Sequence, residues 1–202
     1  MEVRLDNLFY LKKKLKSLGG IFMNEKYDIK KLILTGLMIA LIYLAGSIIK
    51  IPSVGGFVHI GDCMVFLSVI VLGKKRGAVA SAAGMFLVDV LGGYYMWAPI
   101  TLIIKGVMAY ISGAIIEGMK TDKDIVRYIC GFIAGSIFMV AAYFGAGIII
   151  AFLFTQRAGI LEGILYSAKD IMGNIIQVTT GMIIAIPLTA MLKKTKTISF
   201  EN

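Results

Sequence analysis

The chain has 202 residues, of which 58% are hydrophobic and only 16% are charged, and its mean hydropathy is +0.87. A soluble domain of this length exposes more polar surface, so these values exclude a soluble protein and predict one that crosses a membrane several times. The net charge of +9 would suggest nucleic-acid binding in a soluble protein, but its distribution along the chain indicates membrane topology instead, with no nucleic-acid partner.

Residues 1–28 form a basic, weakly apolar N-terminal extension without the apolar core and cleavage site of a signal peptide. We expect either a short cytoplasmic helix on anionic lipid or the product of an upstream start, because Met23 would itself serve as a first residue. Residues 29–192 form the predicted membrane domain. Residues 193–202 form a basic cytoplasmic tail.

Six apolar segments predict an all-α integral membrane fold with six transmembrane helices. They lie at about 30–49, 60–73, 77–92, 99–118, 127–154 and 168–192. Most reach the ~20 residues that a helix needs to cross ~30 Å of hydrocarbon. The second is short, so it requires shielding by its neighbours or a thinned bilayer.

The basic residues predict the orientation of these helices. With the N-terminus inside, most of the 21 Lys and Arg lie in the extension, the tail and the links after the second and fourth segments. This bias places both termini in the cytoplasm and makes the chain a multi-pass protein of the cell membrane. The outer connections are then 51–58, 93–98 and 155–167, which hold the Gly-rich and aromatic loops.

Ionisable residues within the apolar segments gather near the predicted outer face. A charge in the bilayer centre costs ~2.5–3.5 kcal/mol on insertion scales, so it persists where it is paired, faces a cavity or has a function. Asp89 and Lys105 flank one outer turn and form either an ion pair that fixes the hairpin or contacts for a polar ligand. Asp62 is either a helix cap or a ligand contact, and His59 is either a ligand contact or an interfacial loop residue.

Aromatic and amide side chains complete the predicted substrate-binding set. Tyr94, Tyr95 and Trp97 share one Gly-flanked loop, as either an interfacial belt or a stacking surface for a planar heterocycle. Asn174 and Gln177 are three residues apart, so they share a face of the last helix. Their amides need partners from another helix or from a ligand such as a pyrimidine, pyridine or flavin edge.

Small residues and cysteines have other expected roles. Gly36 and Ala40, with Ala45-Gly46 beyond, form a small-residue stripe on the first helix, which permits close packing inside the protein or against another subunit. Cys63 and Cys130 fall in apolar runs and are expected to be reduced thiols, and the chain has no cluster of metal ligands. No phosphate-binding Gly-Lys-Ser/Thr loop is present, so a partner would have to supply energy from ATP.

A pattern of short motifs runs through the whole membrane region. Its residues are Ile51-Pro52, His59-Ile60-Gly61-Asp62, Val65-Phe66-Leu67, Leu72-Gly73, Gly77, Gly84, Asp89, Gly92-Gly93-Tyr94, Ala98-Pro99, Ile103-Ile104-Lys105-Gly106, Gly173-Asn174 and Gln177. With this pattern, the chain resembles the substrate-binding S component of energy-coupling factor (ECF) vitamin transporters, in the riboflavin-type group, over about residues 30–192.

The resemblance implies a six-helix S-component bundle that is not an enzyme and needs no cofactor. Such a protein captures a B vitamin or precursor from outside, here riboflavin or a pyrimidine or pyridine vitamer. Its implied partners are the lipid bilayer, a transmembrane coupling subunit and two ATP-binding subunits that drive uptake. Gly36 and Ala40 occupy the places that meet the coupling subunit, although the family's usual alanine is glycine at the first.

Two other interpretations stay open at this stage. An intramembrane aspartyl protease would use two membrane acids that share a proton, here Asp62 and Asp89. Both acids lie towards the outer ends of their helices, and a lysine would neutralise one of them, which counts against this interpretation. The other is a non-catalytic membrane subunit.

Overall fold

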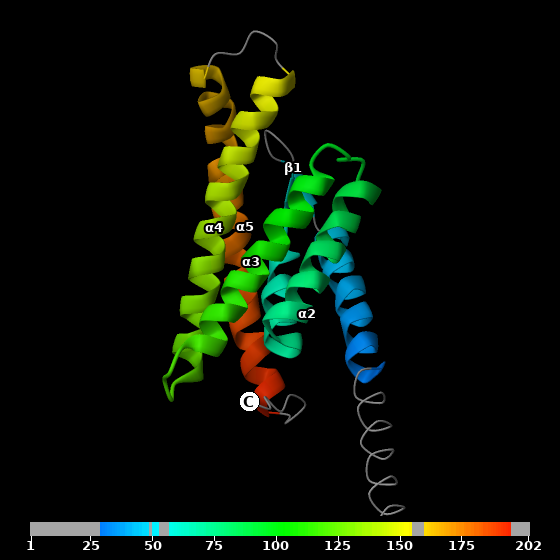
Figure 1. Ribbon diagram of the computed structural model, residues 1–202, viewed down its shortest axis with the longest axis vertical. Coiled ribbons are helices and arrows are strands. Elements are labelled where there is room, and N and C mark those ends of the chain that lie inside the picture. Colours follow the sequence, from blue (N-terminus) through cyan, green and yellow to red (C-terminus); the bar gives the residue numbers. More distant parts are fainter. Residues whose placement is uncertain (1–28, 49, 53–56, 155–159, 195–202) are drawn as a thin grey trace, which may run out of the picture. The chain divides into compact units, whose positions relative to one another are not determined.

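The structure is a computed structural model that describes residues 29–48, 50–52, 57–154 and 160–194. The described part is all-α apart from one small hairpin (Figure 1). Its elements are the Ile29–Ile48 helix, β1 (Lys50–Pro52), β2 (Phe57–His59), α2 (Asp62–Leu91), α3 (Ala98–Gly118), α4 (Asp124–Phe154) and α5 (Ile160–Lys194). The predicted N-terminal extension and most of the predicted tail lie outside the described residues.

Contacts divide the chain at Leu34 into an N-terminal unit and a larger unit that begins at Thr35. Of the N-terminal unit, only the first turns of the Ile29–Ile48 helix are described. Apart from these first turns, all the features that follow lie in the larger unit. Across the described residues, four helices are long and apolar enough to cross a membrane: the Ile29–Ile48 helix, α3, α4 and α5.

The remaining helix, α2, folds back on itself at Gly73. The backbone there has φ 75° and ψ 173°, a conformation that glycine adopts without steric cost. Ser68 and Ser81 are 13 residues apart, yet their Oγ atoms lie 3.0 Å from each other. A straight helix would separate them by about 20 Å. The two halves of α2 are therefore antiparallel, and they correspond to the second and third predicted segments.

A second glycine permits the close contact between these halves. A Cβ atom at Gly77 would lie 2.8 Å from the Cα of Val69, so a larger residue would force the backbones apart. Small residues are used in this way wherever membrane helices approach closely. The short first half of α2 is thereby covered by the second half, which is the shielding that its length requires.

The core lies where α2, α3 and α4 meet. Phe66, Met108 and Phe132 are fully buried, and the rings of Phe66 and Phe132 stack with centroids 4.3 Å apart. Outside this core, large apolar side chains such as Ile137 and Ile183 are 66% exposed. Exposed apolar surface on long helices is expected where lipid, and not water, surrounds them.

The turn of α2, the α3–α4 link and the end of α5 lie at one end of the larger unit, and the α2–α3 loop lies at the other (Figure 1). The turn is held to α3 by Glu117, which accepts a hydrogen bond from the backbone N–H of Lys74 at 2.8 Å and pairs with its Nζ at 2.9 Å. Lys75, Arg76 and Lys123 belong to the same turn and link. The basic residues thus gather at the end opposite the aromatic loop.

Candidate substrate-binding site

A pocket opens beside the α2–α3 loop, where β2, α2, α3, α4 and α5 converge. It encloses about 700 Å³ of empty space, including its open mouth. Its lining residues are Val58, His59, Asp89, Tyr94, Trp97, Thr101, Tyr143, Gly147, Ser167, Asp170, Gly173, Asn174 and Gln177. Six of the nine candidate residues from the sequence are among them: His59, Asp89, Tyr94, Trp97, Asn174 and Gln177.

The aromatic wall of the pocket combines the loop with α4. The rings of Trp97 and Tyr143 are 6.1 Å apart between centroids and are inclined by 52°. Sequence analysis missed Tyr143, because one tyrosine in a long apolar helix carries no signal of the direction in which it points. Tyr95 was expected beside Tyr94 and Trp97, but it does not line the pocket and is 71% exposed.

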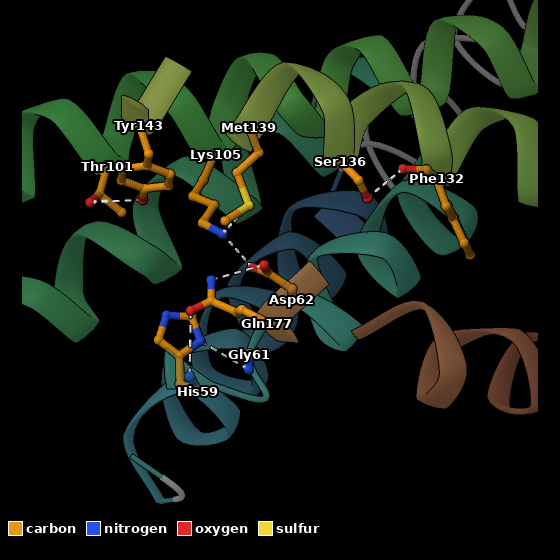
Figure 2. Close-up of polar contacts among 10 residues, drawn as sticks. All are labelled: His59, Gly61, Asp62, Thr101, Lys105, Phe132, Ser136, Met139, Tyr143 and Gln177. Atoms are coloured by element: carbon orange, nitrogen blue, oxygen red, sulfur yellow. Dashed lines mark hydrogen bonds and ion pairs between the residues drawn. The ribbon is translucent and has the colours of Figure 1, made fainter. Parts of the chain in front are cut away.

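A buried ion pair lies next to this pocket (Figure 2). Lys105 on α3 pairs with Asp62 at the start of α2, with Nζ and Oδ1 2.5 Å apart and both side chains fully buried. Lys105 Nζ also lies 3.1 Å from the Sδ of Met139 and 5.6 Å from the ring centroid of Tyr143. Neither Asp62 nor Lys105 lines the pocket itself.

The predicted pair of Asp89 with Lys105 is therefore wrong, since Lys105 bonds to Asp62. Spacing along the sequence sets the depth of a side chain in a helical hairpin, but it does not set which neighbour that side chain faces. The alternative role of Asp62 as a helix cap is also replaced by this pairing, because its two carboxylate oxygens bond to Lys105 and Gln177.

Gln177 connects the ion pair to the hairpin. Its Nε2 donates to Asp62 Oδ2 at 2.9 Å, and its Oε1 accepts the backbone N–H of His59 at 3.4 Å. One side chain on α5 thus holds the start of α2 and the end of β2 together (Figure 2). Gln177 is 5% exposed, so both ends of its amide are used in a buried setting where an unmade hydrogen bond is costly.

His59 is neutral at physiological pH. Burial lowers the pKa of its imidazole from 6.5 to about 4, and the charges of Lys105 and Lys50 act in the same direction against the opposing charge of Asp62. Its Nδ1 accepts the backbone N–H of Gly61 at 3.2 Å, which assigns the ring proton to Nε2. The side chain is 7% exposed.

Asp89 and Ser167 line the pocket, and each has one buried oxygen without a partner in the described part of the chain. Asp89 is 6% exposed and accepts a hydrogen bond from Thr101, yet its Oδ2 has no partner in the described part of the chain. Ser167 is 3% exposed and its Oγ is likewise unpartnered there. Buried polar atoms are nearly always hydrogen-bonded, so two such atoms lining one pocket mark a place where a ligand can bond.

The small-residue stripe of the first helix is divided between two environments. Gly36 and Ala40 are exposed, and a Cβ atom at Gly36 would meet nothing within 4 Å. Gly46 is buried, and a Cβ atom there would lie 2.6 Å from Val88. Only the later part of the stripe is therefore used for packing within the described chain.

The family model for the ECF-type riboflavin transporter S component matches residues 26–194. This chain belongs to that family. It is a substrate-binding membrane subunit and not an enzyme, so the proposed aspartyl protease is excluded. S components need no cofactor themselves, and their partner subunits use the ATP.

Two relatives cover most of this S component. A protein of Pyrococcus woesei, described as an uncharacterized protein in gap 3'region, is 32% identical over 146 residues, which is 72% of this chain and 88% of the relative. The thiamine precursor transporter HmpT of Lactococcus lactis subsp. cremoris is 26% identical over 175 residues, which is 85% of this chain and 92% of the relative.

Proposed function

We propose that this S component captures a small heterocyclic B vitamin or vitamin precursor from outside the cell and passes it on for ATP-driven uptake. The observation that carries the proposal is the pocket, which is lined by Trp97 together with Asp89 and Ser167, each of which has one buried oxygen without a partner in the described part of the chain. Stacking on an aromatic surface with a few directed hydrogen bonds is how proteins hold planar heterocycles. Riboflavin and the pyrimidine or pyridine vitamers are the candidates, and His59, Asn174 and Gln177 are further proposed contacts.

The membrane topology belongs to the same proposal. The two halves of α2 join the four longer helices to give six crossings, with both termini in the cytoplasm. Support comes from the basic turn, link and α5 end, which lie opposite the α2–α3 loop (Figure 1), and residues of that loop line the pocket. Under the positive-inside rule, this arrangement opens the pocket to the outside of the cell membrane.

Energy for uptake would come from a transmembrane coupling subunit and two ATP-binding subunits. Gly36 and Ala40 are proposed to meet the coupling subunit. Support comes from their exposure and from the free space above Gly36, which leave a flat surface for another helix.

Binding is tested on the purified full chain in mild detergent. Native mass spectrometry would look for a co-purified small molecule, and thermal unfolding would be measured with a panel of vitamins and precursors. We expect a bound mass or a raised melting temperature with a heterocycle of this class, because a ligand that binds only the folded state stabilises it. A well-folded protein with no bound molecule and no shift across the panel would contradict the proposal.

A further inference from the structure

The charged groups of the pocket lining are acidic. Asp89 and Asp170 contribute carboxylates, whereas no Lys or Arg appears among the lining residues that the structure describes. His59 is neutral, and the charge of Lys105 is engaged by Asp62. Lys50 on β1 acts electrostatically on Asp89 but does not line the pocket. A phosphorylated or carboxylate ligand would therefore meet like charge without a lining cation, which disfavours it.

The hydrogen bonds around Asp89 specify what a ligand must offer. Tyr143 OH donates to Thr101 Oγ1 at 3.1 Å, which leaves the hydroxyl proton of Thr101 for Asp89. A carboxylate in this setting is fixed by one protein donor and keeps Oδ2 as a buried acceptor without a partner in the described residues. The ligand must supply N–H or O–H donors at this point.

We propose that the ligand turns an amidine-type edge towards Asp89, with an exocyclic amino group beside a ring nitrogen, as in an unphosphorylated 4-aminopyrimidine. This inference rests on the proposed function of the same pocket. With a proton held on the ring nitrogen, this edge donates two parallel hydrogen bonds to the ionised carboxylate of Asp89. Trp97 and Tyr143 form the aromatic wall beside that edge.

The same geometry disfavours a flavin or an oxo-pyrimidine at Asp89. The imide edge of a flavin has a single N–H between two carbonyl oxygens, and a 4-oxo-pyrimidine has one N–H beside one carbonyl oxygen. When its N–H bonds to one carboxylate oxygen, a carbonyl oxygen faces the other, so two acceptors are brought together. Sites built to bond a particular polar group reject analogues that lack it far more strongly than apolar pockets reject a change of size.

The test measures binding to the purified full chain by calorimetry with four probes. These are 4-amino-5-hydroxymethyl-2-methylpyrimidine, its analogue with oxo in place of amino, its phosphate monoester, and riboflavin. We expect the amino compound to bind, the oxo compound to bind at least about 100-fold more weakly, and the phosphate ester to show no binding at matched concentration. The amino and oxo probes differ at one substituent, so this comparison needs no variant protein.

Asp89→Asn supplies the second arm. The amide has nearly the same shape but offers one donor and one acceptor, so it can pair with an oxo edge and no longer accepts both donors of the ring-protonated amino edge. We expect affinity for the amino probe to fall about 10- to 100-fold and the preference over the oxo probe to shrink or reverse. Asp122→Asn makes the same chemical change at an exposed position in the α3–α4 link and should leave both affinities unchanged.

Other binding results would contradict either the amidine inference or the proposed vitamin-binding function. Tight binding of riboflavin or of the oxo probe by the unmodified protein would overturn the amidine inference and leave the vitamin-binding function standing. Equal affinities before and after Asp89→Asn would also overturn the inference. A folded protein that binds none of the four probes overturns the inference, and the vitamin panel then decides the function separately. If Asp89→Asn fails to fold, the amino-against-oxo comparison still decides.

Discussion

Removing Lys105 should destabilise the protein through the charge that it leaves behind on Asp62. In Lys105→Met, the apolar volume is nearly kept, but Asp62 Oδ1 loses its partner at 2.5 Å inside a fully buried site. Breaking a buried pair from one side costs about 3–5 kcal/mol. Gln177 still donates to Oδ2, so we expect the lower end, about 3 kcal/mol. For a chain of this size, that corresponds to a melting temperature about 6–12 °C lower.

The fluorescence of Trp97, the chain's one tryptophan, is a direct assay of this loss during thermal unfolding in detergent. The double variant Asp62→Asn with Lys105→Met removes both charges and keeps an amide that can bond to Gln177. It should therefore lose much less stability than the sum of the two single variants, by about 2 kcal/mol or more. A cost below about 1 kcal/mol for Lys105→Met, or strict additivity in the double variant, would refute the buried pair as described.

The remaining predictions concern the partner surface, the pH dependence and a pocket amide. Gly36→Leu or Ala40→Leu should abolish transport in cells that hold the whole transporter, with ligand binding by the purified subunit unchanged. The unfolded chain binds a proton at His59 below pH 6.5, whereas the folded protein does so only near pH 4. The free energy of unfolding should therefore fall by about 3 kcal/mol as the pH drops from 6.5 to 4. His59→Gln should remove this component of the pH dependence of unfolding. Asn174→Ala should weaken ligand binding by about 1–3 kcal/mol in calorimetry, whereas Tyr95→Ala, outside the pocket, should not.

Specific results would contradict each of these. Loss of ligand binding in Gly36→Leu would mean that this position packs inside the protein. An unfolding profile that is the same with and without His59 between pH 4 and 6.5 would contradict the buried neutral imidazole. Equal effects of Asn174→Ala and Tyr95→Ala on ligand affinity would contradict the assignment of Asn174 to the ligand site and of Tyr95 to the surface outside it.

The sequence predicted much of this architecture because a lipid environment permits few backbone structures, and a long apolar segment within it forms a helix. Apolar length predicted most of the helical segments, including the two halves of α2 on either side of Gly73, but α5 begins at Ile160, within the predicted outer connection 155–167. Charges and aromatics indicated the region of the site for a similar reason, since such residues are costly in lipid and persist where they have partners. Six of the candidate residues consequently lie around one pocket.

The sequence could not predict how each helix is rotated about its own axis, which decides which side chains face each other. Asp62 and Asp89 both precede Lys105 and lie near the same end, and only the packed structure shows which one its ammonium group reaches. Tyr143 joins the pocket for the same reason, because its contribution depends on the face that α4 turns towards α3. Ser167 was missed because it falls in the predicted outer connection 155–167, whereas the structure has it in α5, which begins at Ile160.

The pairing of Lys105 with Asp62 also explains how the carboxylates of Asp62 and Asp89 can lie near each other and still have different roles in ligand binding. The pair neutralises one acid and, through Gln177, fixes the start of α2 against β2. Asp89 is then left with a single hydroxyl donor and an open oxygen. Had Lys105 paired with Asp89, that oxygen would already be satisfied and would not be left for a ligand donor. Asp62 is therefore used to neutralise Lys105, and Asp89 is left to accept hydrogen bonds from a ligand that carries N–H or O–H donors.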